Sequence, residues 1–249
     1  MEMDLVPDAE IMETPLKSAA LVSALGMYDW SLAAKKMLLR EFFISSVSGA
    51  GTKRHTGFIK SAIAGEIGAT FCLTEMSHGT NTKAMRTTAT YNNSTEKFVL
   101  HSPDFEAAKC WAGNLAKTAT HASVFAQLIT PDGVCHGLHN FVVPIRDPKT
   151  LLPLSGVIIG DMGSKIGLNG LDNGWLMFNN YEIDREMLLN KTGDVSKEGI
   201  YKTPFKVRSL YNHIDYRITG WITGSQQALW GFSWQPVRRQ SRNYKHGQY

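Results

Sequence analysis

The spacing of hydrophobic and polar residues predicts helices in the first part of the chain. Between residues 16 and 46, apolar residues recur at helical spacing, and most charged residues fall on the opposite side. The apolar positions of this stripe are Leu21, Leu25, Leu32, Ala33, Leu38, Leu39, Phe42 and Phe43. We expect a break near Gly26, a following helix capped by Asp29 or Ser31, and a further short helix over residues 52–66.

The pattern changes after Ile67 to short runs rich in β-branched and aromatic residues, separated by turn clusters such as Pro131-Asp132-Gly133. The predicted strands span residues 68–75, 85–91, 96–102, 121–130, 138–145, 155–160 and 175–183. Six or seven short strands with such turns favour an antiparallel barrel or sandwich. From about residue 206 no long helical period is present, and Pro236 would interrupt a helix there.

The expected fold class is therefore α+β. It consists of a short N-terminal helical segment, an antiparallel β-barrel and an irregular or helical C-terminus. We expect a partial helical domain over residues 1–66, a β-barrel domain over 67–200, and a remnant of a helical region with a basic tail over 201–249.

Composition and charge narrow the classes of function. The chain is 43% hydrophobic and 19% charged, which is typical of a globular protein. The basic residues of 235–249 account for the whole formal charge of +4, so the rest is neutral, which argues against a nucleic-acid-binding body. We expect a frayed terminus there. No apolar run approaches the length of a membrane span, and the acidic N-terminus does not resemble a signal peptide.

The cysteines and histidines do not form a metal-binding pattern. The three cysteines are widely spaced, so we expect reduced, buried thiols in a reducing compartment. Cys135-His136-Gly137-Leu138-His139 superficially resembles a metal cluster. On a regular strand His136 and His139 would face opposite sides, so the sequence predicts no shared metal site.

Two segments are candidates for ligand binding. Small, hydroxyl and amide residues crowd around Gly79 within residues 71–91, and glycine lets a main chain approach a flat polar ligand and turn. The second segment is Lys109-Cys110-Trp111-Ala112-Gly113-Asn114. Ser77-His78 is not a hydrolase pair, because adjacent residues lack the required geometry and no G-x-S-x-G elbow is present.

Both segments resemble the acyl-CoA oxidases, within the acyl-CoA dehydrogenase superfamily. FCLTEMSHGTNTKAMRTTATY (71–91) is similar to their flavin-contacting strand and loop. The resemblance continues through residues 97–122, 135–153 and 160–183, and its core covers roughly residues 51–206. SPDFEAAK and the GDVSKEG linker look most similar to the branched-chain, pristanoyl-type oxidases, which makes 2-methyl-branched substrates plausible.

The resemblance implies an FAD site and assigns residues to it. Thr74 would donate to the edge of the flavin ring, with Leu73 beside it, and Gly79 and Thr80 would form the tight turn that follows. Trp111 and Gly113 would pass beside the ring. The alternatives are a strand-end threonine bonded to a local carbonyl and a buried core tryptophan. Glu75 is expected to be structural rather than a base.

The implied activity is α,β-desaturation of a fatty acyl-CoA with FAD and O₂, giving trans-2-enoyl-CoA and H₂O₂. In the family, the catalytic glutamate lies on a C-terminal helical domain, and no residue here matches it, so we assign no catalytic residue and expect a truncated chain that is weak or inactive alone. Arg238-Arg239-Gln240-Ser241 resembles the family's pyrophosphate motif, but Ser241 replaces its phenylalanine.

Other interpretations stay open. The chain could be a non-catalytic FAD- or acyl-CoA-binding module, a homodimer, a co-assembly partner of a full-length oxidase, or a prematurely ended product without function. The resemblance implies a peroxisomal location. The final residues, 246–249, are not a serine–lysine–leucine-like signal, so a cytoplasmic location also stays open.

Overall fold

The computed structural model describes residues 15–38 and 42–205. Most of the predicted C-terminal region, including Arg238 and Arg239, lies outside the described residues. Within the described ranges, no helix is both long and apolar enough to cross a bilayer.

Short helices form the N-terminal part, as the apolar stripe predicted. They are α2 (Pro15–Tyr28), α3 (Trp30–Met37), α4 (Phe43–Ala50) and α5 (Thr56–Ile63), with the 3₁₀ turn η2 (Lys53–His55) before α5. Asp29 caps α3, because its carboxylate accepts the backbone N–H groups of Ser31 at 2.7 Å and Leu32 at 3.3 Å. The break between the first two helices therefore lies at Asp29 rather than at Gly26.

Strands follow in three sheets. The six-stranded sheet contains β1 (Ala69–Cys72), β2 (Thr88–Asn92), β3 (Lys97–His101), β5 (His121–Ile129), β6 (Cys135–Pro144) and β9 (Tyr181–Asp184). The three-stranded sheet contains β4 (Lys109–Ala112), β7 (Val157–Asp161) and β8 (Gly174–Phe178), and the two-stranded sheet contains β10 (Asp194–Val195) and β11 (Tyr201–Lys202). Three further 3₁₀ turns are η3 (Thr82–Ala84), η4 (Phe105–Ala107) and η5 (Arg185–Met187).

The α+β class is confirmed, but the six-stranded sheet is mixed rather than purely antiparallel. Both β1 and β2 pair with β5 in parallel, β1 along its first half and β2 along its second half. Parallel neighbours need long connections, and the strands between β2 and β5 provide one. The predicted strand over 175–183 is also divided by a turn at Asn180, whose φ is 48°.

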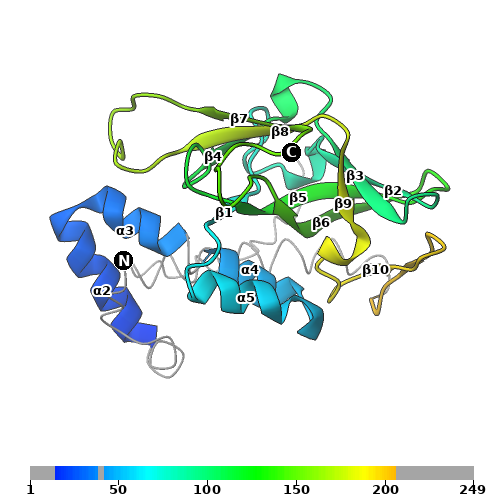
Figure 1. The fold of residues 1–249 in the computed structure, drawn as a ribbon, viewed down its shortest axis with the longest axis horizontal. Coiled ribbons are helices and arrows are strands. Elements are labelled where there is room, and N and C mark those ends of the chain that lie inside the picture. The colour runs from blue at the N-terminus through cyan, green and yellow to red at the C-terminus, as the bar shows by residue number, and fades with distance from the viewer. Residues whose placement is uncertain (1–14, 39–41, 206–249) are drawn as a thin grey trace, which may run out of the picture.

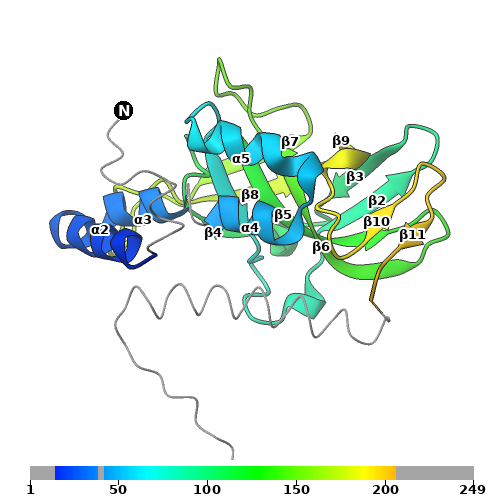
Figure 2. The same ribbon diagram turned by 90° about the horizontal axis from the view of Figure 1, so that it is seen from below.

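The elements are arranged in layers. The three-stranded sheet lies on one side of the six-stranded sheet, and α4 and α5 cover the other side (Figures 1 and 2). The core between the sheets includes edge-to-face contacts of Phe98 with Tyr91 and with Phe141, at centroid distances of 5.1 and 5.2 Å. A second core cluster contains Phe43 and Val47 of α4. The division into domains at 66/67 and 200/201 stays a prediction.

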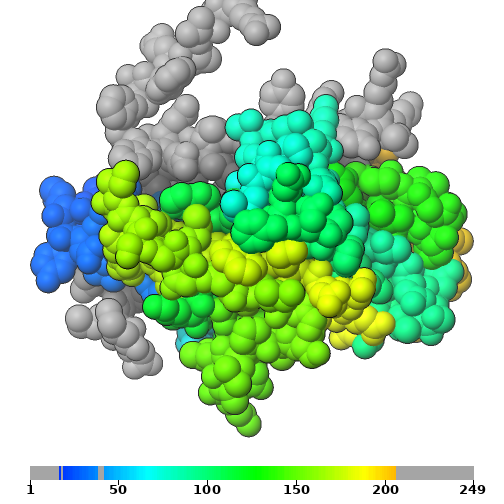
Figure 3. Space-filling model, turned by 90° about the horizontal axis from the view of Figure 1, so that it is seen from above, coloured from blue at the N-terminus to red at the C-terminus, as the bar shows by residue number. Residues whose placement is uncertain are grey.

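Helix α3 contacts a distant part of the chain through polar groups. Lys35 pairs with Asp172 at 2.5 Å, and the Gly170 N–H donates to the Ser31 hydroxyl at 3.3 Å. In Figure 3 the yellow-green loop that follows β7 lies against the blue helices. These contacts bring the N-terminal helices to one end of the three-stranded sheet.

The three cysteines differ in exposure, which corrects the expectation that all are buried. Cys72 and Cys110 are buried and Cys135 is exposed, and all three are free. Cys135 is the first residue of β6, next to the turn that joins β6 to β5, and this explains its exposure. Burial raises the pKa of Cys72 to about 12, so its thiolate is suppressed.

A thiol-reactive reagent is expected to distinguish these cysteines. Ellman's reagent added to the native chain should modify Cys135 rapidly, and Cys72 and Cys110 at least about 100-fold more slowly, because they react only after local opening. In Cys135→Ser the rapid phase should disappear. If two thiols of the native protein react rapidly, Cys72 and Cys110 are not both buried, and the structure is contradicted.

Candidate functional site

The first candidate segment leaves the six-stranded sheet between β1 and β2. The ladder of β1 with β5 ends at Cys72↔Val124, and the ladder of β2 begins at Thr88↔Gln127. Residues 73–87 therefore form a loop, in turquoise at the surface in Figure 3. The loop must be held by contacts other than the β5 ladder.

A buried carboxylate joins the two ends of this loop. Oε1 of Glu75 accepts the Thr87 hydroxyl at 2.7 Å and the Thr87 N–H at 2.9 Å, and Oε2 accepts the Arg86 N–H at 2.8 Å. Glu75 is only 1% exposed. Its role is structural, as the sequence predicted, because its oxygens are occupied by donors from the loop itself.

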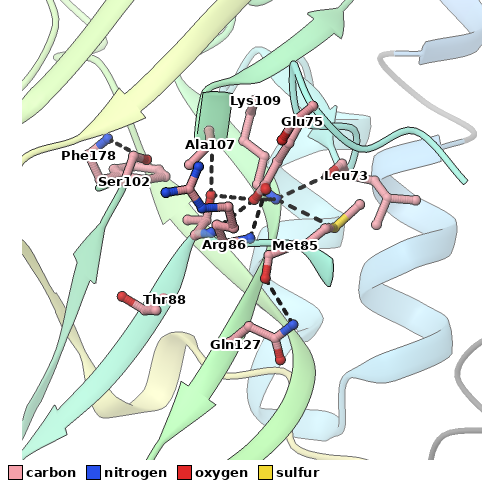
Figure 4. Close-up of polar contacts among 12 residues, drawn as sticks. Leu73, Glu75, Met85, Arg86, Thr88, Ser102, Ala107, Lys109, Gln127 and Phe178 are labelled. Atoms are coloured by element: carbon pink, nitrogen blue, oxygen red, sulfur yellow. Dashed lines mark hydrogen bonds and ion pairs between the residues drawn. The ribbon is translucent and has the colours of Figure 1, made fainter. Parts of the chain in front are cut away.

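The ammonium group of Lys109 completes the cluster. It donates to Glu75 Oε1 at 3.0 Å, to the Leu73 carbonyl at 3.0 Å and to the Met85 sulfur at 3.8 Å (Figure 4). Both charged side chains are fully buried. Since an ammonium has three donors, these contacts satisfy all of them. The sequence analysis did not predict this pair, because 34 residues separate its members.

The electrostatics of the pair favour charged Glu75. Burial alone would raise the pKa of Glu75, but the Lys109 ammonium and the hydrogen bonds from Thr87 and Arg86 outweigh burial and lower it. Burial lowers the pKa of Lys109, and the Glu75 carboxylate opposes that shift. A carboxylate with a lowered pKa that accepts four hydrogen bonds is a poor general base.

An exposed ion-pair cluster adds to the outer side of the loop. The Arg86 guanidinium bonds both oxygens of Asp104 and lies 3.2 Å from the Glu106 carboxylate. The hydrogen bond to Arg86 lowers the pKa of Asp104. Since these side chains are solvent-exposed, they contribute little to stability compared with the buried pair.

The structure brings Thr74 and the second candidate segment together. The Cys110 N–H donates to the Thr74 carbonyl at 3.0 Å, and Glu75 forms an isolated β-bridge with Lys109. Within the described part of the chain, the Thr74 hydroxyl has no hydrogen-bond partner. The interpretation of Thr74 as bonded to a local carbonyl therefore does not hold.

Trp111 lies next to this contact in an unusual conformation. Its φ is 58°, in the left-handed region that a large side chain rarely adopts, and β4 is irregular between Lys109 and Ala112. The side chain is 59% exposed, so it is not a buried core tryptophan. The irregularity leaves an aromatic side chain exposed one residue after Cys110, whose N–H bonds the Thr74 carbonyl, and strained backbone of this kind is common at functional sites.

Gly113 is buried beneath other side chains. A Cβ there would overlap Leu38 Cδ1 and approach Leu171 Cδ2 to 3.1 Å. The Gly113 carbonyl accepts the Thr70 hydroxyl at 2.7 Å. Close packing therefore gives a reason for glycine at this position that needs no ligand. A flavin contact of Gly113 stays a prediction.

Gly79 and Thr80 lie on the exposed outer part of the loop. Gly79 is not among the glycines with positive φ, and a Cβ there would meet nothing within 4 Å. The turn itself therefore does not require glycine, contrary to the expectation from the sequence. Only a ligand that approaches the backbone would make a side chain unfavourable here.

The expectation that His136 and His139 face opposite sides of a regular strand is wrong. Gly137 has a φ of 85° and lies in an irregular part of the β5–β6 ladder, so the alternation of β6 is shifted. Both histidines consequently contact Tyr201. The His136 ring stacks on the Tyr201 ring with a centroid distance of 4.0 Å, and His139 Nε2 lies 2.9 Å from the Tyr201 hydroxyl. The described residues contain no group of three or more side chains able to hold a metal.

Comparisons with known proteins identify the family. Residues 70–181 match the model described as "Acyl-CoA dehydrogenase, middle domain". Over 205 residues the chain is 55% identical to the human protein named peroxisomal acyl-coenzyme A oxidase 3, and the match covers 82% of this chain. The chain belongs to the acyl-CoA oxidase family. It spans only 29% of the length of that human relative.

Solved oxidase structures share the fold. Acyl-CoA oxidase 1 from Yarrowia lipolytica superposes with a TM-score of 0.74 at 33% identity, over 85% of this chain and 30% of that one. Acyl-CoA oxidase-2 from Caenorhabditis elegans, solved with FAD, ascaroside-CoA and ATP, superposes with a TM-score of 0.64 at 36% identity, over 68% of this chain and 26% of that one.

Alanine substitutions at Gly113 and Gly79 should differ in their effect on the free energy of unfolding. Gly113→Ala is expected to lower the free energy of unfolding by about 1–3 kcal/mol, because Leu38 and Leu171 occupy the space of the added methyl group. Gly79→Ala should change it by less than about 0.5 kcal/mol. Urea unfolding of both variants checks this, and equal stabilities would contradict the packing at Gly113.

The buried histidine of β6 should make stability depend on pH. Burial lowers the pKa of His139 from 6.5 to about 4. Between these values the unfolded chain binds more protons than the folded chain, so the stability falls as the pH decreases, by about 3 kcal/mol for this group. In His139→Gln this part of the pH dependence should disappear from urea unfolding. The same slope in both proteins would contradict a neutral buried imidazole.

Proposed function

We propose that this chain binds FAD through Leu73, Thr74, Gly79, Thr80, Trp111 and Gly113. Two features of bonded backbone segments carry the proposal. The Thr74 hydroxyl has no hydrogen-bond partner among the described residues, and the Trp111 side chain is exposed in the neighbouring segment. A solved relative that contains FAD supports the same cofactor.

The chemistry of these groups fits a flavin. The Thr74 hydroxyl is able to donate to a polar ring edge, and the Trp111 side chain offers a flat apolar surface for an aromatic ring. Gly79 and Thr80 expose backbone without a crowded side chain nearby. Gly113 would contribute through its backbone, because the space on its side-chain face is taken by Leu38 and Leu171.

The proposed reaction class is the α,β-desaturation of a fatty acyl-CoA, with trans-2-enoyl-CoA and H₂O₂ as products. When bound, FAD supplies the redox chemistry, namely acceptance of the β-hydride and its transfer to O₂. The residues of this chain would bind and orient the cofactor and limit water on the Trp111 side. Because relatives are named peroxisomal acyl-CoA oxidases, we propose a peroxisomal location.

A second candidate function is binding without turnover. Glu75 is the one carboxylate within residues 73–80 and 109–113, and its oxygens are fully engaged. No carboxylate of these two segments is therefore free to remove the α-proton. This observation favours an FAD- or acyl-CoA-binding module, acting alone or with a longer oxidase subunit.

FAD retention is expected to depend on Thr74 and Trp111. After addition of FAD and desalting, the unaltered chain should keep the visible flavin absorption band. Trp111→Ala and Thr74→Val should bind FAD about tenfold more weakly, because each removes a direct contact. Tyr28→Ala is the matched control, since Tyr28 is an exposed aromatic residue of α2.

The outcome of this titration decides between the alternatives. Equal affinity of the Trp111 and Tyr28 variants would show that FAD binds elsewhere. No retained flavin in the unaltered chain would contradict the proposal. If flavin is retained, anaerobic addition of a fatty acyl-CoA separates the two functions: bleaching followed by H₂O₂ formation in air indicates an oxidase, and an unchanged flavin spectrum indicates a binding module.

A further inference from the structure

The position of Leu73 and Thr74 depends on contacts outside the sheet that β1 belongs to. The β1 ladder with β5 stops at Cys72, so no strand of the six-stranded sheet holds the next residues. Their neighbours belong to β4, which is part of the three-stranded sheet. Among the proposed flavin contacts, Leu73, Thr74 and Trp111 therefore lie at a junction between two sheets.

The junction contains a short series of bonds from consecutive residues. Lys109 Nζ donates to the Leu73 carbonyl, the Cys110 N–H to the Thr74 carbonyl, and Lys109 Nζ also to the Glu75 carboxylate, each at 3.0 Å. Two of these three bonds come from one ammonium group. The ammonium therefore links the first residue of β4 to the backbone that follows β1 and to the Glu75 carboxylate.

The pair is unusual among the described residues. The described residues, 15–38 and 42–205, form several ion pairs. The Glu75–Lys109 pair is the one among them in which both side chains are fully buried. Buried ion pairs are often no more stabilising than apolar residues of the same volume. Stability alone therefore does not explain the pair, whereas directional bonds to Leu73, Thr87 and Arg86 would define one arrangement of the loop.

We infer that Lys109 and Glu75 are positioning residues, whose buried ion pair holds Leu73 and Thr74 against β4 in the arrangement that binds the flavin. The inference rests on the proposed function for its ligand. Neither residue needs to touch the cofactor. The ammonium fixes the Leu73 carbonyl, the carboxylate fixes residues 86 and 87 at the far end of the loop, and Thr74 and Trp111 are thereby presented together.

The test is a double variant, Lys109→Met with Glu75→Gln. Removing both charges avoids leaving one unpaired in the interior, and methionine keeps the unbranched stem of lysine. The matched control is Lys97→Met with Glu182→Gln. Lys97 is also the first residue of its strand and pairs with a glutamate at 3.8 Å, but that pair is exposed.

Two measurements on the full chain are needed. Amide hydrogen exchange followed by NMR should show Cys110 exchanging at least about tenfold faster in the double variant, because its acceptor, the Thr74 carbonyl, is no longer held. The amides of Val124 and Phe141 in the β5–β6 ladder should stay within about twofold. In an FAD titration, the affinity should fall about tenfold or more.

A purely structural role would change folding without changing these site readouts. Unchanged exchange at Cys110 would overturn the inference, and so would faster exchange with unchanged FAD affinity. A control variant that loses FAD affinity equally would also overturn it, because the effect would not belong to the buried pair. If the unaltered chain binds no FAD, the proposed function fails and this inference falls with it, and that outcome is recognised in the unaltered protein alone.

Discussion

The buried ion pair of Glu75 and Lys109 is the constraint on which the site depends. Removing one member of such a pair typically costs about 3–5 kcal/mol, because the remaining charge is left in a low-dielectric interior. The pair is tolerated here because every donor of the ammonium and both carboxylate oxygens have partners. The same contacts connect two sheets at the point where the proposed ligand contacts lie.

The sheet arrangement explains why this connection is needed. Strand β5 is long enough to pair with β1 and β2 one after the other on a single edge. The chain between them must leave the sheet, and its backbone groups need other partners. Those partners come from the Glu75 carboxylate, from Ala108 and Glu106, and from β4. A polar loop is thereby held at a defined place on a rigid scaffold.

Local patterns predicted the local elements well. The apolar stripe located the N-terminal helices, the short β-rich runs located most strands, and Asp29 capped α3 as expected. Contacts between distant residues were not predictable. The parallel pairing of β1 and β2, the irregular β4 and the shifted alternation at Gly137 all depend on which strands meet. The partner of Glu75 is another such contact, because no periodicity relates position 75 to position 109.

The central claim is that the β1–β4 junction is the flavin site. The most direct test is amide hydrogen exchange of the unaltered chain with and without FAD. Slower exchange confined to residues 73–80 and 109–113, with no change in β10 and β11, is the predicted result. Slower exchange elsewhere, or no change in these two segments when FAD is bound, would contradict the account.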